Sequence, residues 1–409
     1  MVLVTPGSVV GIASVAEGAR VKYVVVSDYS LQYLGGAQVA MLRQAEALAS
    51  MGHEVHLIAP GGSGETMPTG VTYIAPPTAR VIPLVGLPVF TNTATLRQWF
   101  DEHFATLTPD AVLTHSEFGL AVAAVQVAHS RKAVTLHTVH TFFWRSNYVS
   151  DAIAGVARSF YQRRTGLVLG NEQLTKHRLA NTLRLMTLAM CRQVDVVISP
   201  SAHQGARLAE CGLARVEVIS NVTASVASPE HGEAPTDRLV LLWAARFAPE
   251  KRLAVAVSAM GEVKRRLREQ GRDANLVELQ VAGGAAQSDP NVTWLGQLTP
   301  DQVRTRISNA NAIVITSVGF DNQPMVALEA FAAGRPVIVS DPVLATEFSD
   351  SSIRASATDA HGLAETILQL VDDSTLIERA REAATLRARL SSPQGHVAAL
   401  DAVVASVRN

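Results

Sequence analysis

Runs of β-branched residues alternate with amphipathic segments along the first half of the chain. The first run, 21–28 (VKYVVVSD), is rich in valine, as are strands of a parallel sheet that is buried on both faces. The segment 37–52 repeats apolar residues at helical spacing and ends at Gly52, a residue type common at helix C-termini. Further strands are predicted for 53–60, 71–77, 110–116, 133–140, 194–201 and 216–221. This alternation predicts a doubly wound α/β sheet.

The second half of the chain restarts the same pattern. Residues 238–247 (RLVLLWAARF) predict a strand, and 253–271 predict the helix that follows it. Further strands are predicted for 277–284, 292–297, 312–317 and 335–341, and the Ala-rich stretch 358–407 is predicted to be helical. We therefore expect two similar α/β domains that face each other across a cleft, with ligands bound at the carboxyl ends of the strands.

The length of 409 residues exceeds what one hydrophobic core usually supports, so two domains are expected. Residues 1–20 are a separate N-terminal extension that belongs to no predicted element. The first domain covers 21–222 and the second covers 238–390. Between them, 223–237 is small, polar and proline-bearing, which is typical of a linker. A C-terminal helix is expected within 391–409.

The charge of the chain is nearly balanced, with 35 Lys and Arg residues against 36 Asp and Glu residues. A nucleic-acid-binding protein would carry a basic excess, so no nucleic-acid partner is expected. Neither a leader peptide nor a bilayer-spanning segment is recognisable, which favours a cytoplasmic location. The segment 151–193 is helical and basic. It suits contact with anionic lipid on the cytoplasmic face of a membrane, and the alternative is an ordinary solvated helix face.

Two features at strand-to-helix loops suit the binding of phosphate. Gly35 and Gly36 precede the first helix, where backbone approaches a phosphate closely and the helix N-terminus supplies free N–H groups. A plain turn is the alternative, because the dinucleotide fingerprint GxGxxG is missing. Arg246 lies at the C-terminal edge of the first strand of the second domain, and Lys251 comes five residues later; they would offer a guanidinium fork and a mobile ammonium group. An ordinary surface ion pair is the alternative there.

Two histidines end the predicted strand 133–140. His137 is expected at the site because a doubly wound sheet binds ligands at the carboxyl ends of its strands, and a satisfied core histidine is the alternative. His140 is expected to have no role in the site. No metal site is predicted, since no third ligand accompanies the two histidines.

A carboxylate within an apolar helix is the most unusual feature of the sequence. The stretch 321–334 (DNQPMVALEAFAAG) predicts a loop followed by a helix that begins near Pro324. Glu329 lies in the second turn of this helix, eight residues after Asp321. Burying a carboxylate is costly unless it finds a partner. Two ribose hydroxyls would satisfy Glu329, and so would an ion pair with a basic residue.

Taken in order, these segments resemble the retaining GT-B glycosyltransferases of family four from about residue 21 to 390. The matching pieces are GGAQ (35–38), DVVISPSAHQGARLAECGL (195–213), ARFAPEKR (245–252), VTWLGQLTPDQV (292–303) and EAFAAGRPVIVSD (329–341). The resemblance implies transfer of a hexose from a UDP-sugar or GDP-mannose to a lipid or glycan hydroxyl, with retention of configuration and without a metal or other cofactor. The segment 135–144 (TLHTVHTFFW) is most similar to the lipid-glycosylating branch.

The resemblance also implies a role for each domain and for the charged candidates. The first domain would bind the acceptor, the second would bind the nucleotide sugar, and the C-terminal helix would pack back on the first domain. Arg246 and Lys251 match a diphosphate-binding pair, and Glu329 matches the glutamate that holds the ribose. Asp321 stands where the family has a glutamate near the donor sugar, so it is one methylene shorter and puts the identity of the sugar in doubt.

The remaining candidates are uncharged groups and one histidine. Gly35 and Gly36 match the loop that covers the phosphates, and His137 matches a histidine near the transferred sugar. The loop residues that would line the sugar pocket are Asn322, Gln323, Pro324, Met325 and Val326. Two other functions remain open from the sequence: a GT-B nucleotide-sugar epimerase and a non-catalytic nucleotide-sugar-binding protein.

Overall fold

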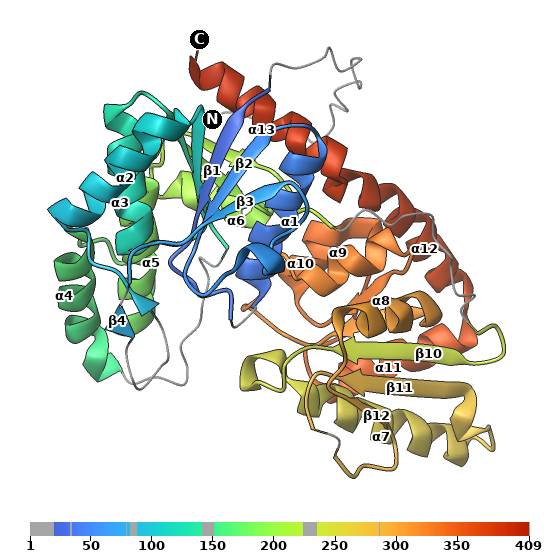
Figure 1. The fold of residues 1–409 in the computed structure, drawn as a ribbon. Coiled ribbons are helices and arrows are strands. Elements are labelled where there is room, and N and C mark those ends of the chain that lie inside the picture. Colours follow the sequence, from blue (N-terminus) through green and yellow to red (C-terminus); the bar gives the residue numbers. More distant parts are fainter. Residues whose placement is uncertain are drawn as a thin grey trace, which may run out of the picture.

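The computed structural model describes residues 20–32, 35–78, 80–81, 88–140, 151–223, 235–285 and 287–408. These residues form two α/β halves that lie side by side, and a long final helix runs from the second half back along the first (Figure 1). Most of the predicted linker 223–237 and nearly all of the predicted extension 1–20 lie outside the described residues.

The first half is built on a seven-stranded sheet in the order β3-β2-β1-β6-β7-β8-β9, and every pair of neighbours is parallel. Its strands are β1 (Lys22–Val26), β2 (Glu54–Ile58), β3 (Val71–Ile74), β6 (Ala111–Thr114), β7 (Val134–Thr138), β8 (Val196–Ser199) and β9 (Val216–Val218). A short antiparallel pair, β4 (Arg80–Val81) and β5 (Pro88–Val89), stands apart from this sheet. Each strand predicted for the first domain is present in the large sheet.

Helices cover both faces of this sheet, which explains the apolar sequence of β1. They are α1 (Gly36–Ser50), α2 (Ala94–Leu107), α3 (Gly119–Ser130), α4 (Ala154–Thr165), α5 (Arg178–Cys191), α6 (Ala202–Glu210) and, from the end of the chain, α13 (Pro393–Arg408). Tyr23 and Val25 pack on the face that α1 and α13 cover. Val24 and Val26 pack beneath α2 and α3. Both faces of β1 are therefore core.

The second half repeats this design with six parallel strands in the order β12-β11-β10-β13-β14-β15. The strands are β10 (Leu239–Ala244), β11 (Val277–Ala282), β12 (Thr293–Gly296), β13 (Ala312–Ile315), β14 (Val337–Val339) and β15 (Ser352–Arg354). The helices are α7 (Leu253–Glu269), α8 (Pro300–Asn309), α9 (Met325–Ala332), α10 (Pro342–Phe348), α11 (Ala360–Asp372) and α12 (Thr375–Arg387). Short 3-10 turns lie at Gly64–Thr66, Asp151–Ile153, Pro249–Lys251, Ala274–Leu276, Ser349–Ser351 and Ala388–Ser391. The sequence did not predict β15, a three-residue edge strand with little apolar pattern.

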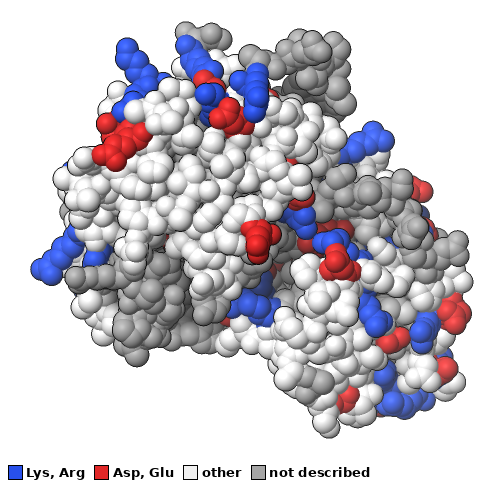
Figure 2. Space-filling model, viewed as in Figure 1, with Lys and Arg blue, Asp and Glu red and all other residues white. Residues whose placement is uncertain are grey.

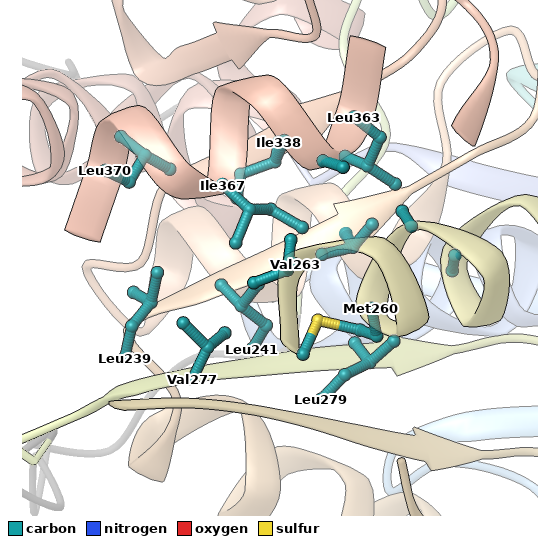
Figure 3. Close-up of a cluster of buried hydrophobic side chains, with 14 of the residues drawn as sticks. Leu239, Leu241, Met260, Val263, Val277, Leu279, Ile338, Leu363, Ile367 and Leu370 are labelled. Carbon is teal, nitrogen blue, oxygen red and sulfur yellow. The ribbon is translucent and has the colours of Figure 1, made fainter. Parts of the chain in front are cut away.

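A core between β10, α7 and α11 supports the second half (Figure 3). Leu239 and Leu241 of β10 pack with Met260 and Val263 of α7 and with Ile367 of α11. Each buried side chain of this size contributes about 1.5–3 kcal/mol to folding. This packing fixes the end of β10, and with it the loop that carries the predicted phosphate-binding residues.

Helix α13 joins the two halves by returning to the first one. Val397 enters the core of the first half, and the hydroxyl of Tyr23 donates to Asp401 Oδ1 at 2.7 Å. The chain crosses between the halves twice, and the two crossings touch, since the backbone N–H of Thr223 donates to the carbonyl of Ser391 at 3.0 Å. The two segments that connect the halves are therefore hydrogen-bonded to each other.

A second contact between the halves lies at the start of α6. Glu347 of α10 accepts hydrogen bonds from the backbone N–H groups of Ala202 and His203, each at 3.1 Å, and contacts the Nδ1 atom of His203 at 3.0 Å. A carboxylate at a helix N-terminus is favourable by about 0.3–1 kcal/mol. The second half thus caps a helix of the first half.

Candidate active site

A cavity of about 760 Å³ lies between the two halves. One wall comes from the start of α1, the chain after β6 and β7, and α5. The other comes from the loops after β10 and β13 and from the start of α9. Both walls lie at the carboxyl ends of parallel strands, where doubly wound sheets bind ligands. Figure 2 shows Lys and Arg side chains along the hollow between the halves, interspersed with Asp and Glu side chains.

Two helices begin at this cavity, one from each half. Gly36 and Gln38 at the start of α1 line it, as do Met325 and Val326 at the start of α9. The first N–H groups of a helix have no partner within the helix, so two such ends supply donors and positive potential to one space. A Cβ at Gly36 would meet no protein atom within 4 Å, which leaves room for a ligand beside the backbone. Gly35 caps α1 but does not line the cavity.

The two predicted phosphate-binding residues both line the cavity. Arg246 is 73% exposed and contacts Glu250 at 3.5 Å. The ammonium group of Lys251 donates to Asp321 Oδ1 at 2.5 Å, and the hydroxyl of Ser317 donates to the other oxygen of Asp321. Asp321 therefore faces the cavity as one partner of an ion pair, with its charge balanced by Lys251.

The loop between Asp321 and α9 is held in place by the first half of the molecule. Gln323 accepts from the backbone N–H of Asn221 at 2.8 Å and donates to the hydroxyl of Ser220 at 2.9 Å. Asn322 accepts from the hydroxyl of Ser201, whereas its own Nδ2 is buried without a partner among the described residues. A buried donor without a partner is uncommon in proteins, and a bound ligand would satisfy this one. All five predicted loop residues, 322–326, line the cavity.

Glu329 occupies the next turn of α9. It lies three and four residues after Val326 and Met325, which both line the cavity, so it is on their side of the helix, but it does not itself line the cavity. Burial raises the pKa of its carboxyl group, and the charges of Arg43 and Arg304 offset this in part. Within the described ranges no hydrogen bond or ion pair involves the carboxyl group of Glu329, and Arg43 pairs with Glu46 instead. The ion pair that the sequence left open is thus not formed among the described residues, and the binding of ribose by Glu329 stays a prediction.

The structure places His140, rather than His137, at the cavity. His137 is fully buried, lies on the same sheet face as Thr135 beneath α3, and contacts Thr114 Oγ1 at 2.9 Å through Nδ1. Burial lowers its pKa to about 3. Strand β7 ends at Thr138, so His140 lies beyond the sheet and lines the cavity. The expected cavity position is taken by His140, because strand alternation directs His137 under the helix layer, and a part for His137 in the reaction stays a prediction.

Glu117 is a cavity residue that the sequence reading missed. It accepts hydrogen bonds from the hydroxyls of Tyr29 at 3.2 Å and Thr187 at 3.4 Å, and no cation contacts it in the described part of the chain. Burial raises the pKa of its carboxyl group to about 7. Its signal in the sequence is a single acid just after the predicted strand 110–116. An unpaired carboxyl group in a cleft is a common mark of a functional residue.

Asp28 also follows a strand at this end of the sheet, yet its contacts are structural. It is buried, and its oxygens accept from the backbone N–H groups of Leu120 at 2.8 Å and Ala121 at 3.2 Å and from the hydroxyl of Ser116 at 2.7 Å. These bonds satisfy the start of α3. Asp28 therefore stabilises the wall on which Glu117 is presented.

Comparison with known families assigns both halves of the chain. The profile described as Glycosyltransferase Family 4 matches residues 34–224, and that described as Glycosyl transferases group 1 matches residues 238–373. The chain belongs to glycosyltransferase family 4. The resemblance inferred from the sequence is thereby confirmed. This family 4 enzyme is a retaining glycosyltransferase that uses a nucleotide-sugar donor.

Individual relatives of this glycosyltransferase are distant. A phosphatidyl-myo-inositol mannosyltransferase of Mycolicibacterium smegmatis is 23% identical over 86% of this chain and 85% of its own length. An alpha-monoglucosyldiacylglycerol synthase of Acholeplasma laidlawii is 25% identical over 37% of this chain and 38% of its own. The crystal structure of Anabaena HepE in complex with UDP superposes with a TM-score of 0.64 at 13% identity, covering 94% of this chain and 100% of that one. The predicted GT-B fold is confirmed by this likeness.

Over the described residues, no three His, Cys, Asp or Glu side chains are grouped so that they would hold a metal ion. None of the described helices has the length and apolar character needed to cross a bilayer.

Proposed function

We propose that this enzyme transfers a hexose from a UDP-sugar or GDP-mannose to a hydroxyl group of a membrane lipid, with a glycan as the alternative acceptor. The observation that carries the proposal is the single cavity with two unlike walls. The second-half wall offers Arg246, Lys251 and the N-terminus of α9, and the first-half wall offers the N-terminus of α1 and, among apolar side chains, a carboxyl group that no cation contacts in the described part of the chain. These walls suit a nucleotide diphosphate and a hydroxyl-bearing acceptor, respectively.

The donor would lie against the second half of the molecule. Its diphosphate would lie between the starts of α1 and α9, near Arg246 and Lys251, and its ribose hydroxyls would bind Glu329. The sugar would contact the backbone of 322–326 and the ion pair of Lys251 with Asp321. Uridine is the favoured base because the structurally similar HepE is known in complex with UDP and with UDP-glucose.

The transfer step would use the charge of the diphosphate rather than a protein nucleophile. As the bond between the sugar and the diphosphate breaks, the negative charge that develops on the phosphate oxygens would be stabilised by Arg246, Lys251 and the helix N-termini. The acceptor hydroxyl would attack the anomeric carbon from the same face and give its proton to a phosphate oxygen. Attack from the face that the diphosphate leaves gives retention of configuration.

The acceptor would bind the wall formed by the first half. The apolar side chains of Phe118, Leu183 and Met186 line this wall together with Glu117. An acceptor that carries a hydroxyl beside an apolar group, such as a glycerolipid, fits this mixture. The names of two relatives, which refer to phosphatidyl-myo-inositol and to a glucosyldiacylglycerol, agree with a lipid acceptor.

An exposed apolar group near α4 supports contact with a membrane surface. Ile153 is 46% exposed, Val156 71% and Val168 82%. The carboxylate of Asp151 accepts from the backbone N–H of Leu179 at 3.0 Å, which places the start of α5 beside Ile153. The aromatic residues 142–144 (FFW), which precede this segment in the sequence, lie outside the described residues.

The basic residues of 151–193 differ in their contacts, and Arg192 pairs with Glu172 at 2.7 Å. Arg158, Arg164 and Arg184 donate to backbone carbonyls or to Thr91 and stabilise this part of the fold. Arg163, Lys176 and Arg178 are exposed instead. The proposed membrane surface therefore consists of these three cations and the apolar residues near α4, and is smaller than the whole basic run.

The test of the proposed function is release of nucleotide diphosphate. UDP-glucose, UDP-galactose, UDP-N-acetylglucosamine and GDP-mannose are each incubated with the enzyme, alone and with vesicles that carry diacylglycerol or phosphatidylinositol. We expect one donor to release its nucleotide only when a lipid acceptor is present. Epimerised sugar without an acceptor would indicate the epimerase, and tight binding without turnover under all conditions would indicate a binding protein.

The membrane surface is tested by vesicle sedimentation. Arg163→Glu/Arg178→Glu is expected to pellet at least about threefold less with anionic vesicles than wild type does, since each surface cation adds roughly 1 kcal/mol of attraction. Arg306→Glu/Arg379→Glu makes the same charge change at exposed positions of the second half and should pellet as wild type. Equal pelleting of both variants and wild type would reject the surface.

A further inference from the structure

A row of buried hydrogen bonds leads from the cavity to the junction of the two halves. His140 Nε2 lies 2.8 Å from His115 Nδ1, and His115 Nε2 lies 2.8 Å from Gln44 Oε1. Gln44 Nε2 lies 2.8 Å from His396 Nε2, and His396 Nδ1 lies 2.7 Å from the carbonyl oxygen of Ser220. His115, Gln44 and His396 are each 3% exposed. We refer to these five residues as the histidine row.

We propose that His115, Gln44 and His396 are positioning residues for the transfer reaction, because they fix both the ring orientation and the tautomer of His140 in the cavity. The proposal rests on the transfer reaction proposed above taking place in this cavity. Gln44 and His396 do not line the cavity, so they act on a substrate only through the other members of the row.

The donor and acceptor of every hydrogen bond in the row follow from the carbonyl oxygen of Ser220 at its end. A carbonyl oxygen only accepts, so His396 carries its proton on Nδ1. Burial lowers the pKa of His396 to about 4, so this ring is neutral at pH 7 and its Nε2 accepts from the amide NH₂ of Gln44. The oxygen of the same amide must then accept from His115, which therefore carries its proton on Nε2.

The same logic reaches His140. Burial and the neighbouring histidines hold the pKa of His115 well below its usual range, so His115 is neutral and its Nδ1 accepts from His140. Burial also lowers the pKa of His140 to about 4. His140 thus carries its proton on Nε2 and keeps Nδ1 as an acceptor. The two rings are stacked with their centroids 5.1 Å apart, which restricts rotation of His140.

The row also connects both walls of the cavity. Ser220 follows β9, its hydroxyl accepts from Gln323 at 2.9 Å, and that hydroxyl lies 2.8 Å from the hydroxyl of Ser391. Gln323 lines the cavity from the second half, whereas His140 lines it from the first. Because His396 lies on α13, the orientation of His140 requires that this helix is packed on the first half. The orientation of His140 in the first-half wall therefore depends on contacts at Ser220, and the same residue hydrogen-bonds to Gln323 of the second-half wall.

A buried polar row also has an ordinary explanation, which is that it satisfies groups that folding removes from water. The two explanations differ in what they predict. A row that merely satisfies buried groups affects stability alone. A row that positions His140 sets its tautomer and affects kcat without changing the KM of the donor.

The first measurement is ¹⁵N NMR of the full chain, labelled at histidine, at pH 7 in the presence of UDP. We expect His396 to carry its proton on Nδ1, and His115 and His140 to carry theirs on Nε2. A proton on Nε2 of neutral His396, or a doubly protonated ring in the row, would overturn the proposal. This measurement needs no acceptor, so it tests the row even where the proposed transfer fails.

The second measurement compares two variants that both disturb buried contacts near α13. Gln44→Met removes the two hydrogen bonds of the side-chain amide, to His115 and His396, at nearly constant side-chain volume. We expect kcat to fall about tenfold with the KM of the donor unchanged. His53→Gln is the matched control, since His53 contacts Asp401 of α13 at 3.1 Å outside the row, and it should keep the wild-type kcat. Equal kcat values in the two variants would show that the row is only structural.

Discussion

The two walls of the cavity differ in how their charges are balanced. On the second-half wall, Lys251 is paired with Asp321 at 2.5 Å, and both ends of the Gln323 amide are hydrogen-bonded. On the first-half wall, Glu117 has two hydroxyl donors but no cation in contact among the described residues, and Phe118 beside it is apolar. The first arrangement is organised before a ligand arrives, whereas the second leaves a carboxyl group whose charge depends on pH and on the ligand.

This difference indicates how the two substrates would be recognised. A nucleotide diphosphate carries fixed charges, so a preorganised wall binds it without rearranging several side chains. An acceptor offers neutral hydroxyls, and a carboxyl group with open hydrogen-bonding capacity suits them. The donor wall should therefore be sensitive to loss of a charge, and the acceptor wall to loss of one hydrogen-bonding group.

The largest effect is expected at Lys251. Lys251→Met removes a phosphate-binding cation and leaves Asp321 without its partner, so kcat/KM for the donor should fall about 100-fold or more. Lys264→Met, at a lysine that does not line the cavity, is the control and should stay within about twofold of wild type. Steady-state kinetics with the active donor measures both, and equal rates for both variants would mean that the donor wall lies elsewhere.

A smaller loss is expected at Glu329. Glu329→Gln should weaken the binding of UDP about tenfold, because an amide oxygen replaces one charged acceptor of the ribose hydroxyls. Its Tm should not fall, since burial already disfavours the charged carboxylate and no ion pair is lost among the described contacts. Calorimetric titration and thermal unfolding test this pair of outcomes. A lower Tm with unchanged UDP affinity would make Glu329 a structural residue.

Glu117 is expected to affect the acceptor alone. Glu117→Gln should raise the KM of the acceptor about fivefold by removing one good hydrogen-bond acceptor, with the KM of the donor unchanged. Initial rates at varied acceptor and fixed donor measure this effect. A rise in the KM of the donor of the same size would mean that the two walls do not separate the substrates.

The same substitution should show a dependence of stability on pH. In the unfolded chain this carboxyl group ionises near pH 4.5, whereas burial raises its folded pKa to about 7. Between these values the folded state holds a proton that the unfolded state has lost, so the contribution of Glu117 to stability falls as pH rises through this window. Glu117→Gln should therefore raise the unfolding free energy by roughly 3 kcal/mol more at pH 8 than at pH 4.5, since each unit of pKa corresponds to about 1.4 kcal/mol. An equal gain at both pH values would contradict the assigned pKa.

The residues of the second-half wall could be placed at the cavity from the sequence because they belong to short local segments. Arg246 and Lys251 share one loop after β10, and the loop 321–326 leads directly into α9. In both cases the strand or helix that the pattern predicts also fixes where the side chains lie. The same holds for the two sheets, whose strands are marked by their valine-rich runs.

The acceptor wall was not predictable in the same way, because it depends on contacts between distant segments. Glu117 is defined by its bonds to Tyr29 and Thr187, which are 88 and 70 residues away in sequence. Gln44 and His396 are hydrogen-bonded although they are 352 residues apart in sequence. Whether His137 or His140 lines the cavity depended on where β7 ends. The strand ends at Thr138, two residues before the predicted end at 140, so His140 lies beyond the sheet.

The most direct test of this account is a crystal structure of the enzyme with UDP bound. The account predicts that the diphosphate lies between the N-termini of α1 and α9, within hydrogen-bonding distance of Lys251 and Arg246, and that the ribose hydroxyls contact Glu329. Lys251 should then divide its contacts between Asp321 and the phosphates. UDP bound outside the cavity, or with its ribose away from Glu329, would contradict the account.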